Sequence, residues 1–471
     1  MNAHPLWPYV DAKAAEARVL SDAVWATPET CYAERASSSA HAAHLAREGF
    51  RVTKGAAEIP TAVIGEAGQG GPVIAFLGEF DALAGLNQEA DVAERRPLTP
   101  GANGHGCGHN MLGAASLLAA TALKDWLAET GTPGTVRYYG CPAEEGGAGK
   151  TFMVREGLFD DVDVAISWHP HAIPAVMRGS SLANTRIDFT FTGRASHAAA
   201  SPELGRSALD GVELMSVGVN YLREHMADTA RIHYAIIDGG GISPNVVQAR
   251  AKVRYVVRSE TVPEMLTLIE RVRNVAKGAA LMSETEVADE VLAAVSNLLP
   301  NGPLIGAMQK NLDRLGPPPF DDLDRGYAAR FQSTFNAQER AASFNMVGVP
   351  PRTDLALTDF VVPEDAPPAS LSGSTDVADV SWVVPTVQMW GGNYAIGTPF
   401  HSWQMVAQGK SGPALKGMVH AAQVMAATGA DALLDPDLIA RAKADLAVQV
   451  GPEGYTCPLA ADAVPPVKQM A

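Results

Sequence analysis

Three apolar segments of this chain each end in a cluster of polar, chemically reactive side chains. VIAFLGE (73–79) runs into FDAL, TVRYYGC (135–141) runs into PAEEGG, and DVAISW (163–168) runs into HPH. Helix-like segments separate them, and strands that alternate with helices are typical of an α/β fold with a mostly parallel sheet. Because such sheets build ligand sites at the carboxyl ends of their strands, we expect these polar clusters to lie together.

A different pattern occupies residues 183–298. Its segments follow the order strand, helix, strand, strand, helix, strand, which is the order of a ferredoxin-like (βαββαβ) domain. We therefore expect a catalytic domain formed by residues 1–182 and 299–471, with the ferredoxin-like domain inserted between them. Within the second part, the Pro-rich clusters of residues 317–372 are expected to form a long excursion over the surface.

The composition bears on partners and location. The 471 residues include 36 Lys+Arg against 52 Asp+Glu, a formal charge of -16, which argues against a nucleic-acid or anionic-membrane surface and favours a small-molecule partner. The chain has neither a membrane-spanning apolar run nor a signal-peptide pattern, so we expect a cytoplasmic protein. Its four cysteines lie far apart, unlike the dense disulfide framework of a small secreted domain.

The stretch HGCGHN (105–110) places one thiol and two imidazoles within five residues. It could be half of a disulfide, a nucleophilic Cys107 with His105 or His109 as its base, or a pair of metal ligands, Cys107 and His109. Thiolate and imidazole are ligands that zinc and related ions favour. Taken alone, however, the pair also fits a tight loop with a buried thiol.

Further candidate ligands follow the other strands. Glu144 and Glu145 stand in CPAEEGG, His169 in SWHPH and His401 in GTPFHSW. Each is by itself more often structural, as part of a solvated loop or as an ordinary histidine, but two adjacent carboxylates at a strand end can both reach a cleft. As a set, the side chains are those needed to bind two ions roughly 3.5–4 Å apart with a water between them: Cys107, His109, Glu145, His169 and His401.

These motifs resemble those of the M20 metallopeptidases, in the amidohydrolase branch that contains hippurate hydrolase and the auxin-conjugate hydrolases. The resemblance rests on GEFDALAGL, NGHGCGHN, YGCPAEEGGAGKTFMVREG, SWHPH, SPELGRSALD, GGISPNVVQA, STDVADVSW and GTPFHSWQ. It implies a hydrolase that cleaves N-acyl amino acids, with p-aminobenzoyl-glutamate as the expected substrate. It also implies a cofactor of two divalent ions, zinc or manganese, with cobalt as a further candidate.

The resemblance implies a role for each matching residue. Glu144 would be the general base, and Asp81 would orient a ligand imidazole. His197 would cross a dimer interface to stabilise the oxyanion, which makes the inserted domain a lid and dimerisation domain. Asn245 would contact the substrate, and Arg258 is a further candidate for gripping its carboxylate. The implied metal ligands are Cys107, His109, Glu145, His169 and His401.

One position departs from the pattern, because relatives in this branch usually read HACGHD where this chain has Asn110. The missing carboxylate would change the charge near the ions. Two alternatives also stay open. A cysteine hydrolase using Cys107 would leave Glu145, His169 and His401 without a role. An accessory subunit of a hetero-oligomeric hydrolase, paired with a homologous chain, would not need the complete set of ligands.

Overall fold

Two β-sheets organise the computed structural model, which describes residues 3–369 and 373–467. The larger has seven strands in the order β1-β2-β4-β3-β5-β11-β6. Their bounds are Arg51–Lys54 (β1), Val63–Gln69 (β2), Val73–Glu79 (β3), Gly134–Cys141 (β4), Val164–His169 (β5), Ala175–Val176 (β6) and Thr386–Trp390 (β11).

The strands of the larger sheet run in mixed directions. The centre, β4-β3-β5-β11, is parallel, whereas β1, β2 and β6 pair antiparallel at the two sides. The prediction of a mostly parallel sheet is therefore wrong outside the centre, and the fold is a mixed α/β fold. Connections explain the difference, because helices lead from β3 to β4 and from β4 to β5, while a short loop joins β1 to β2 and allows only an antiparallel pair.

Helices cover both faces of this sheet, because alternate residues of each strand point to opposite faces. Ile74 and Phe76 of β3 pack with α3, whereas Ala75 and Leu77 pack with α4 and α10. The helices of this part are α1 (Trp7–Ala26), α2 (Arg35–Arg47), α3 (His109–Thr130), α4 (Gly149–Arg155), α7 (Gly302–Leu315), α8 (Asp322–Gln332), α9 (Ala337–Asn345), α10 (Val377–Val383), α11 (Trp403–Gln408), α12 (Gly412–Leu434) and α13 (Pro436–Val450). No helix in the described ranges is both long and apolar enough to cross a bilayer.

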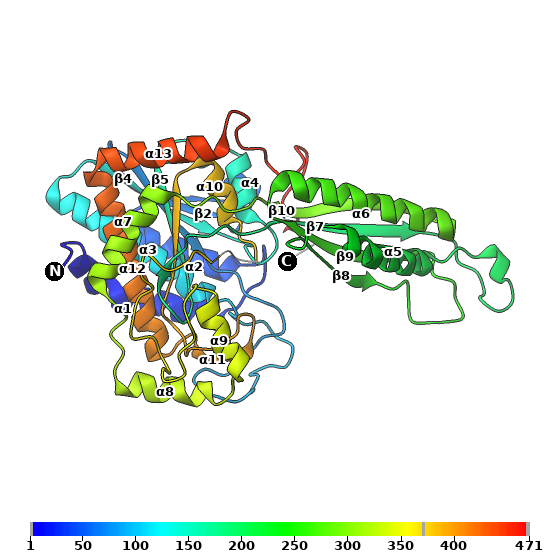
Figure 1. Ribbon diagram of the computed structural model, residues 1–471, viewed down its shortest axis with the longest axis horizontal. Coiled ribbons are helices and arrows are strands. Elements are labelled where there is room, and N and C mark those ends of the chain that lie inside the picture. Colours follow the sequence, from blue (N-terminus) through cyan, green and yellow to red (C-terminus); the bar gives the residue numbers. More distant parts are fainter. Residues whose placement is uncertain (1–2, 370–372, 468–471) are drawn as a thin grey trace.

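The second sheet is antiparallel throughout, in the order β10-β7-β9-β8. With its helices it follows the predicted βαββαβ order and projects from the rest of the molecule (Figure 1). We call residues 183–295 the four-stranded unit. Its elements are β7 (Ala183–Thr192), α5 (Ala208–Leu222), β8 (Arg231–Asp238), β9 (Arg250–Ser259), α6 (Val262–Ser283) and β10 (Glu286–Val295).

The two faces of the four-stranded sheet carry different side chains. Ile187 and Phe189 of β7 are buried in the core that this sheet forms with α5 and α6. Asn184 and Arg186 alternate with them and therefore lie on the opposite face, where β9 places Arg258 directly across from Asn184. One face thus forms a core, and the other presents polar and cationic groups.

Residues 317–369 contain more regular structure than their Pro-rich sequence predicts. They contain α8 and α9, each of which begins with a capping box, and they bury Phe331 and Phe344. The prediction of a surface excursion therefore misses two packed helices. Residues 370–372 lie outside the described ranges.

Candidate metal centre and substrate cavity

The carboxyl ends of the central strands bring the predicted side chains together. Asp81 follows β3, Glu144 and Glu145 follow β4, His169 ends β5, and His401 lies in the loop after β11. These strands are parallel neighbours, so their ends meet at one edge of the sheet.

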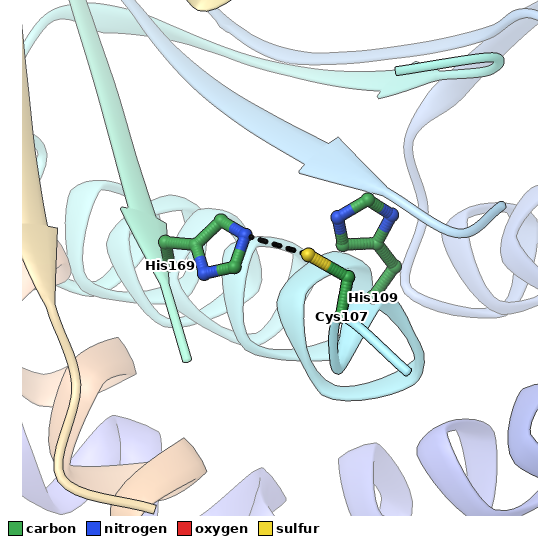
Figure 2. A group of neighbouring side chains, drawn as sticks. All are labelled: Cys107, His109 and His169. Atoms are coloured by element: carbon green, nitrogen blue, oxygen red, sulfur yellow. Dashed lines mark hydrogen bonds between the residues drawn. The ribbon is translucent and has the colours of Figure 1, made fainter. Parts of the chain in front are cut away.

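Cys107 belongs to two overlapping groups of potential ligands. It groups with His109 and His169 on one side and with Glu145 and His401 on the other, and the ligand atoms of each group lie within 4.8 Å of one another. Cys107 Sγ is 3.3 Å from His169 Nε2 (Figure 2). His401 Nε2 is 3.4 Å from Glu145 Oε2. Together the two groups offer five side chains that would hold divalent ions, with Cys107 common to both groups.

Two buried atoms of these groups have no hydrogen-bond partner in the described chain, His109 Nε2 and Glu145 Oε1. His109 Nε2 approaches Glu79 Oε2 at 3.3 Å but without hydrogen-bond geometry. Imidazole nitrogen and carboxylate oxygen bind zinc-like ions, and a buried polar atom without a partner is destabilising. The residues present therefore fit a pair of divalent ions.

The HGCGHN loop depends on one left-handed glycine. Gly108 has a φ of 78°, and a Cβ there would lie 2.4 Å from Tyr394 Oη, so only glycine fits. The turn at Gly108 leads directly into α3, which begins at His109, inside the HGCGHN motif. The backbone N–H of His401 donates to the Gly106 carbonyl at 2.8 Å and ties the loop after β11 to this motif.

Asp81 is buried and accepts two hydrogen bonds. Its Oδ1 lies 2.9 Å from His109 Nδ1, and its Oδ2 accepts from the backbone N–H of Glu145 at 2.8 Å. Although burial opposes it, the bond from His109 lowers the pKa of Asp81. A single carboxylate thus positions two of the potential ligands.

Glu144 lies beside a buried charge network that the sequence did not reveal. Lys150 Nζ is 2.6 Å from Glu79 Oε1 and 2.6 Å from Asp376 Oδ1, and all three side chains are buried. Glu144 Oε2 is 4.0 Å from His109 Nε2. Burial, together with the nearby carboxylate of Glu79, raises the pKa of Glu144. A carboxylate with a raised pKa accepts a proton more readily, as a general base must.

Burial of the thiol and the position of His105 count against a cysteine hydrolase with His105 as its base. A nucleophilic thiol needs a lowered pKa, whereas burial and the charge of Glu145 raise the pKa of Cys107. His105 is turned away, with its Nε2 3.0 Å from the Val24 carbonyl oxygen. For His109, the other candidate base, burial lowers the pKa, but the nearby Cys107 and Asp81 together outweigh that effect and the pKa is raised. Burial lowers the pKa of His169, the imidazole next to the thiol, to about 4, which makes it a weak base.

A cavity of about 540 Å³ opens over these side chains. Its apolar lining includes two aromatic rings, Trp390 and Phe400, whose centroids lie 5.4 and 5.5 Å from that of His169. The apolar lining residues are Leu83, Met177, Met346, Trp390 and Phe400. The polar lining beyond the ligand groups and Glu144 includes Asn184, Arg186, Arg258, Ser374, Thr375 and Gln388.

The three predicted residues of the four-stranded unit, Arg258, His197 and Asn245, do not all lie at the cavity. Arg258 lines the cavity, as its expected contact with substrate requires. His197 and Asn245 are exposed in neighbouring loops of the four-stranded unit, and the residues that line the cavity of the same chain do not include them. Their expected roles therefore need a second chain. Sequence reasoning missed Asn184 and Arg186, whose only signal was the alternation of polar and apolar residues in β7.

Asn110 faces away from the ligand groups. Its Nδ2 donates to Ser21 Oγ at 3.0 Å and to the Gly409 carbonyl at 3.1 Å. We expected the change from Asp to alter the charge near the ions, but the side chain instead joins α3 to α1 and to the loop at Gly409.

Comparisons with known proteins agree with this geometry. Residues 75–401 match peptidase family M20/M25/M40, and the chain belongs to this family. It is 45% identical over 456 residues to a p-aminobenzoyl-glutamate hydrolase subunit of Escherichia coli (strain K12), covering 95% of each chain. The Xaa-Arg dipeptidase of Mus musculus is 29% identical over 452 residues, which cover 91% of this chain and 88% of the relative.

A solved structure shares the fold. It is a Bacillus subtilis protein described as a dinuclear metal binding peptidase from the M20 family. Its TM-score to this chain is 0.57 at 18% sequence identity, and the alignment covers 91% of this chain and 99% of the other.

Proposed function

We propose that this protein is a metal-dependent amidohydrolase that cleaves N-acyl amino acids, with p-aminobenzoyl-glutamate as its substrate. The observation that carries this proposal is the pair of ligand groups that share Cys107, placed beside Glu144 in one cavity. The 45% identical relative, named for p-aminobenzoyl-glutamate hydrolysis, supports the choice of substrate.

The proposed cofactor is two divalent ions, zinc or manganese, with cobalt as a further candidate. When bound, such ions polarise the amide carbonyl and lower the pKa of a coordinated water. The side chains that would hold them are Cys107, His109, Glu145, His169 and His401.

The chain's own residues would then move the protons. Glu144 accepts a proton from the attacking water and delivers it to the nitrogen of the leaving amine. Asp81 holds His109 in the tautomer whose Nε2 is free to act as a ligand. Arg258 pairs with the carboxylate of the amino acid, and this contact orients the amide over Glu144.

A second chain would complete the site. β8 is one of the two outer strands of the four-stranded sheet, and it exposes the side chains of Tyr234, Ile236 and Ile237. An exposed edge strand of this kind can pair with another chain. In a homodimer formed there, His197 would donate a hydrogen bond to the developing oxyanion in the partner's cavity, and Asn245 would contact the partner's substrate. The 45% identical relative is named as one part of its hydrolase, which supports an alternative in which a homologous chain replaces the second copy.

The lining of the cavity favours an N-aroyl acidic amino acid over a peptide that ends in arginine. Trp390 and Phe400 offer an apolar surface for an aromatic acyl group. Arg186 and Arg258 would repel a substrate guanidinium and attract carboxylates. We also propose a cytoplasmic location, since the four cysteines are free thiols, as a reducing compartment requires.

The test is metal analysis combined with a hydrolysis screen on the purified chain alone. We expect two ions per chain and hydrolysis of p-aminobenzoyl-glutamate in preference to hippurate and to dipeptides ending in arginine. A fully metal-loaded chain that hydrolyses none of these substrates would instead support the accessory-subunit alternative.

A further inference from the structure

Arg186 is a cation in the cavity wall for which the reaction steps above have no role. It lies on β7 two residues after Asn184 and therefore on the same face of the sheet, and Asn184 is directly opposite Arg258 in the β7–β9 register. All three side chains line the 540 Å³ cavity. Two guanidinium groups and one amide thus enter the cavity together from the four-stranded unit.

A second, smaller cavity of about 40 Å³ adjoins the first at Arg186. The two share lining residues, among them Glu144, Gly146, Asn184 and Arg186, and β10 supplies part of the remaining wall. The guanidinium packs so closely on Gly146 that a Cβ at that position would collide with it. The small cavity has room for a group the size of a carboxylate, since roughly 10–15 Å³ of such space admits one water.

The charge of Arg186 has no fixed counter-ion. The structure gives its guanidinium neither a hydrogen bond nor an ion pair among the described residues, because Asp188, the acidic residue on the same face of β7, bonds Arg254 at 2.7 Å and Lys252 at 3.2 Å. Asp376, which lines the small cavity, is paired with Lys150. Asn184 adds a buried side-chain oxygen that also lacks a partner among the described residues.

Burial lowers the pKa of Arg186 and that of Arg258, and in Arg258 the charge of Arg186 lowers it further. Two half-buried cations in one cavity wall destabilise the folded protein unless a ligand brings negative charge. A guanidinium presents a planar fork of donors that matches a carboxylate, so carboxylates are the ligands this pair suits.

We propose that Arg186 binds the side-chain carboxylate of an acidic leaving amino acid, while Arg258 binds its α-carboxylate, so that Arg186 determines the specificity for glutamate. This inference rests on the proposed amidohydrolase function. Arg186, which belongs to neither group of metal ligands, then contacts the substrate and determines which amino acid is accepted.

The experiment compares p-aminobenzoyl-glutamate with p-aminobenzoyl-glutamine, which differ only in the side-chain carboxylate. In the metal-loaded wild-type protein, kcat/KM should be roughly 10–100-fold higher for the glutamate substrate, the usual worth of a hydrogen bond to a charged group. Arg186→Met should lower kcat/KM for the glutamate substrate by a similar factor and change the glutamine substrate less than about threefold. Arg186→Lys, which keeps the charge and loses the fork, should retain part of the preference.

The matched control is Arg250→Met, an exposed arginine at the start of β9, which should leave the ratio of the two substrates unchanged. Equal rates on both substrates in the wild-type protein, or an equal loss on both in Arg186→Met, would overturn the inference while the proposed function stands. Failure of the wild-type protein on every N-acyl amino acid would overturn the proposed function itself. Metal content and thermal unfolding identify a misfolded variant. If Arg186→Met is misfolded, the kcat/KM ratio of the two substrates in the wild-type protein and in Arg186→Lys decides whether the inference holds.

Discussion

Asp81 and His109 are joined by a hydrogen bond of 2.9 Å between Oδ1 and Nδ1, and both side chains are fully buried. The bond fixes which imidazole nitrogen carries the proton and leaves Nε2 near the carboxylates of Glu79 and Glu144. The orientation of His109 therefore depends on a carboxylate that need not touch an ion.

Asp81→Asn should weaken metal binding by roughly 10–100-fold. The two oxygens of Asp81 accept from His109 Nδ1 and from the backbone N–H of Glu145, whereas an amide has only one oxygen that can accept. The measurement is a competition titration against a chelator of known affinity. Asp379→Asn is the matched control, since Asp379 is equally buried but bonds Ser296 and Thr151. It should lower the unfolding temperature and leave metal affinity unchanged, and equal metal loss in both variants would contradict the role of Asp81.

Glu144→Gln and Glu145→Gln should have different effects although the two residues are adjacent. Glu144→Gln should keep both ions and substrate affinity while kcat falls by roughly 10²–10⁴, the usual worth of a positioned general base. Glu145→Gln should lose metal as well as rate. Metal analysis and steady-state kinetics on both variants test this, and the opposite pattern would exchange the two roles.

Chelation should abolish hydrolysis, and zinc, manganese or cobalt should restore it. Cys107→Asp should keep part of the activity, because a carboxylate can replace a thiolate as a ligand but cannot act as a thiol nucleophile. Full turnover by a chain that elemental analysis shows to be metal-free, or an acyl-thioester trapped at Cys107, would instead favour the cysteine hydrolase.

Mixing a His197→Ala chain with a Glu144→Gln chain should restore activity that neither has alone. If His197 acts in the cavity of the partner, half of the sites in a mixed dimer contain both intact residues. Rates before and after demonstrated subunit exchange are the measurement. Exchange without recovery would place His197 outside the partner's site.

The protein should lose stability in mild acid because several buried histidines resist protonation. Burial lowers the pKa of His41 from 6.5 to about 4 in the folded protein, so the unfolded chain binds the extra proton first as the pH falls. The part of the free energy of unfolding that depends on neutral His41 is fully present above about pH 6.5. It declines as the pH falls toward 4, by about 3 kcal/mol for one such group.

His41→Leu should remove that part of the decline. Urea midpoints at pH 7.5, 6.5, 5.5 and 4.5 should fall less steeply for the variant below about pH 6.5, while neither protein changes much above it. Identical slopes in the two proteins would show that folding does not lower the pKa of His41.

Local sequence patterns predicted which strand ends would bring the candidate site residues together. Asp81, Glu144 and His169 each follow an apolar run, and a buried strand places its next residues at the edge of the sheet whatever the distant chain does. The βαββαβ order was predictable for the same reason, since each element has its own periodicity.

Long-range packing determined what the sequence could not predict. The direction of β2 depends on its pairing with β4, which lies about 70 residues away along the chain. The Lys150 network joins side chains from three separate segments. The cavity likewise joins Arg186 of the four-stranded unit to residues that follow strands of the larger sheet. No local pattern reports such placements. The roles that we propose for His197 and Asn245 need a second chain, which no pattern within one chain can place.

The place of β11 has a consequence for synthesis on the ribosome. β11 (Thr386–Trp390) lies between β5 and β6 in the sheet, although these two strands precede it by more than 200 residues. Until residue 390 has left the exit tunnel, the nascent sheet lacks an inner strand and β5 has an open edge. We therefore expect nascent chains arrested at residue 380 to be cleaved rapidly by protease within residues 163–182, and chains arrested past residue 440 to be protected there. Equal cleavage at both lengths would show that β5 is covered by other means.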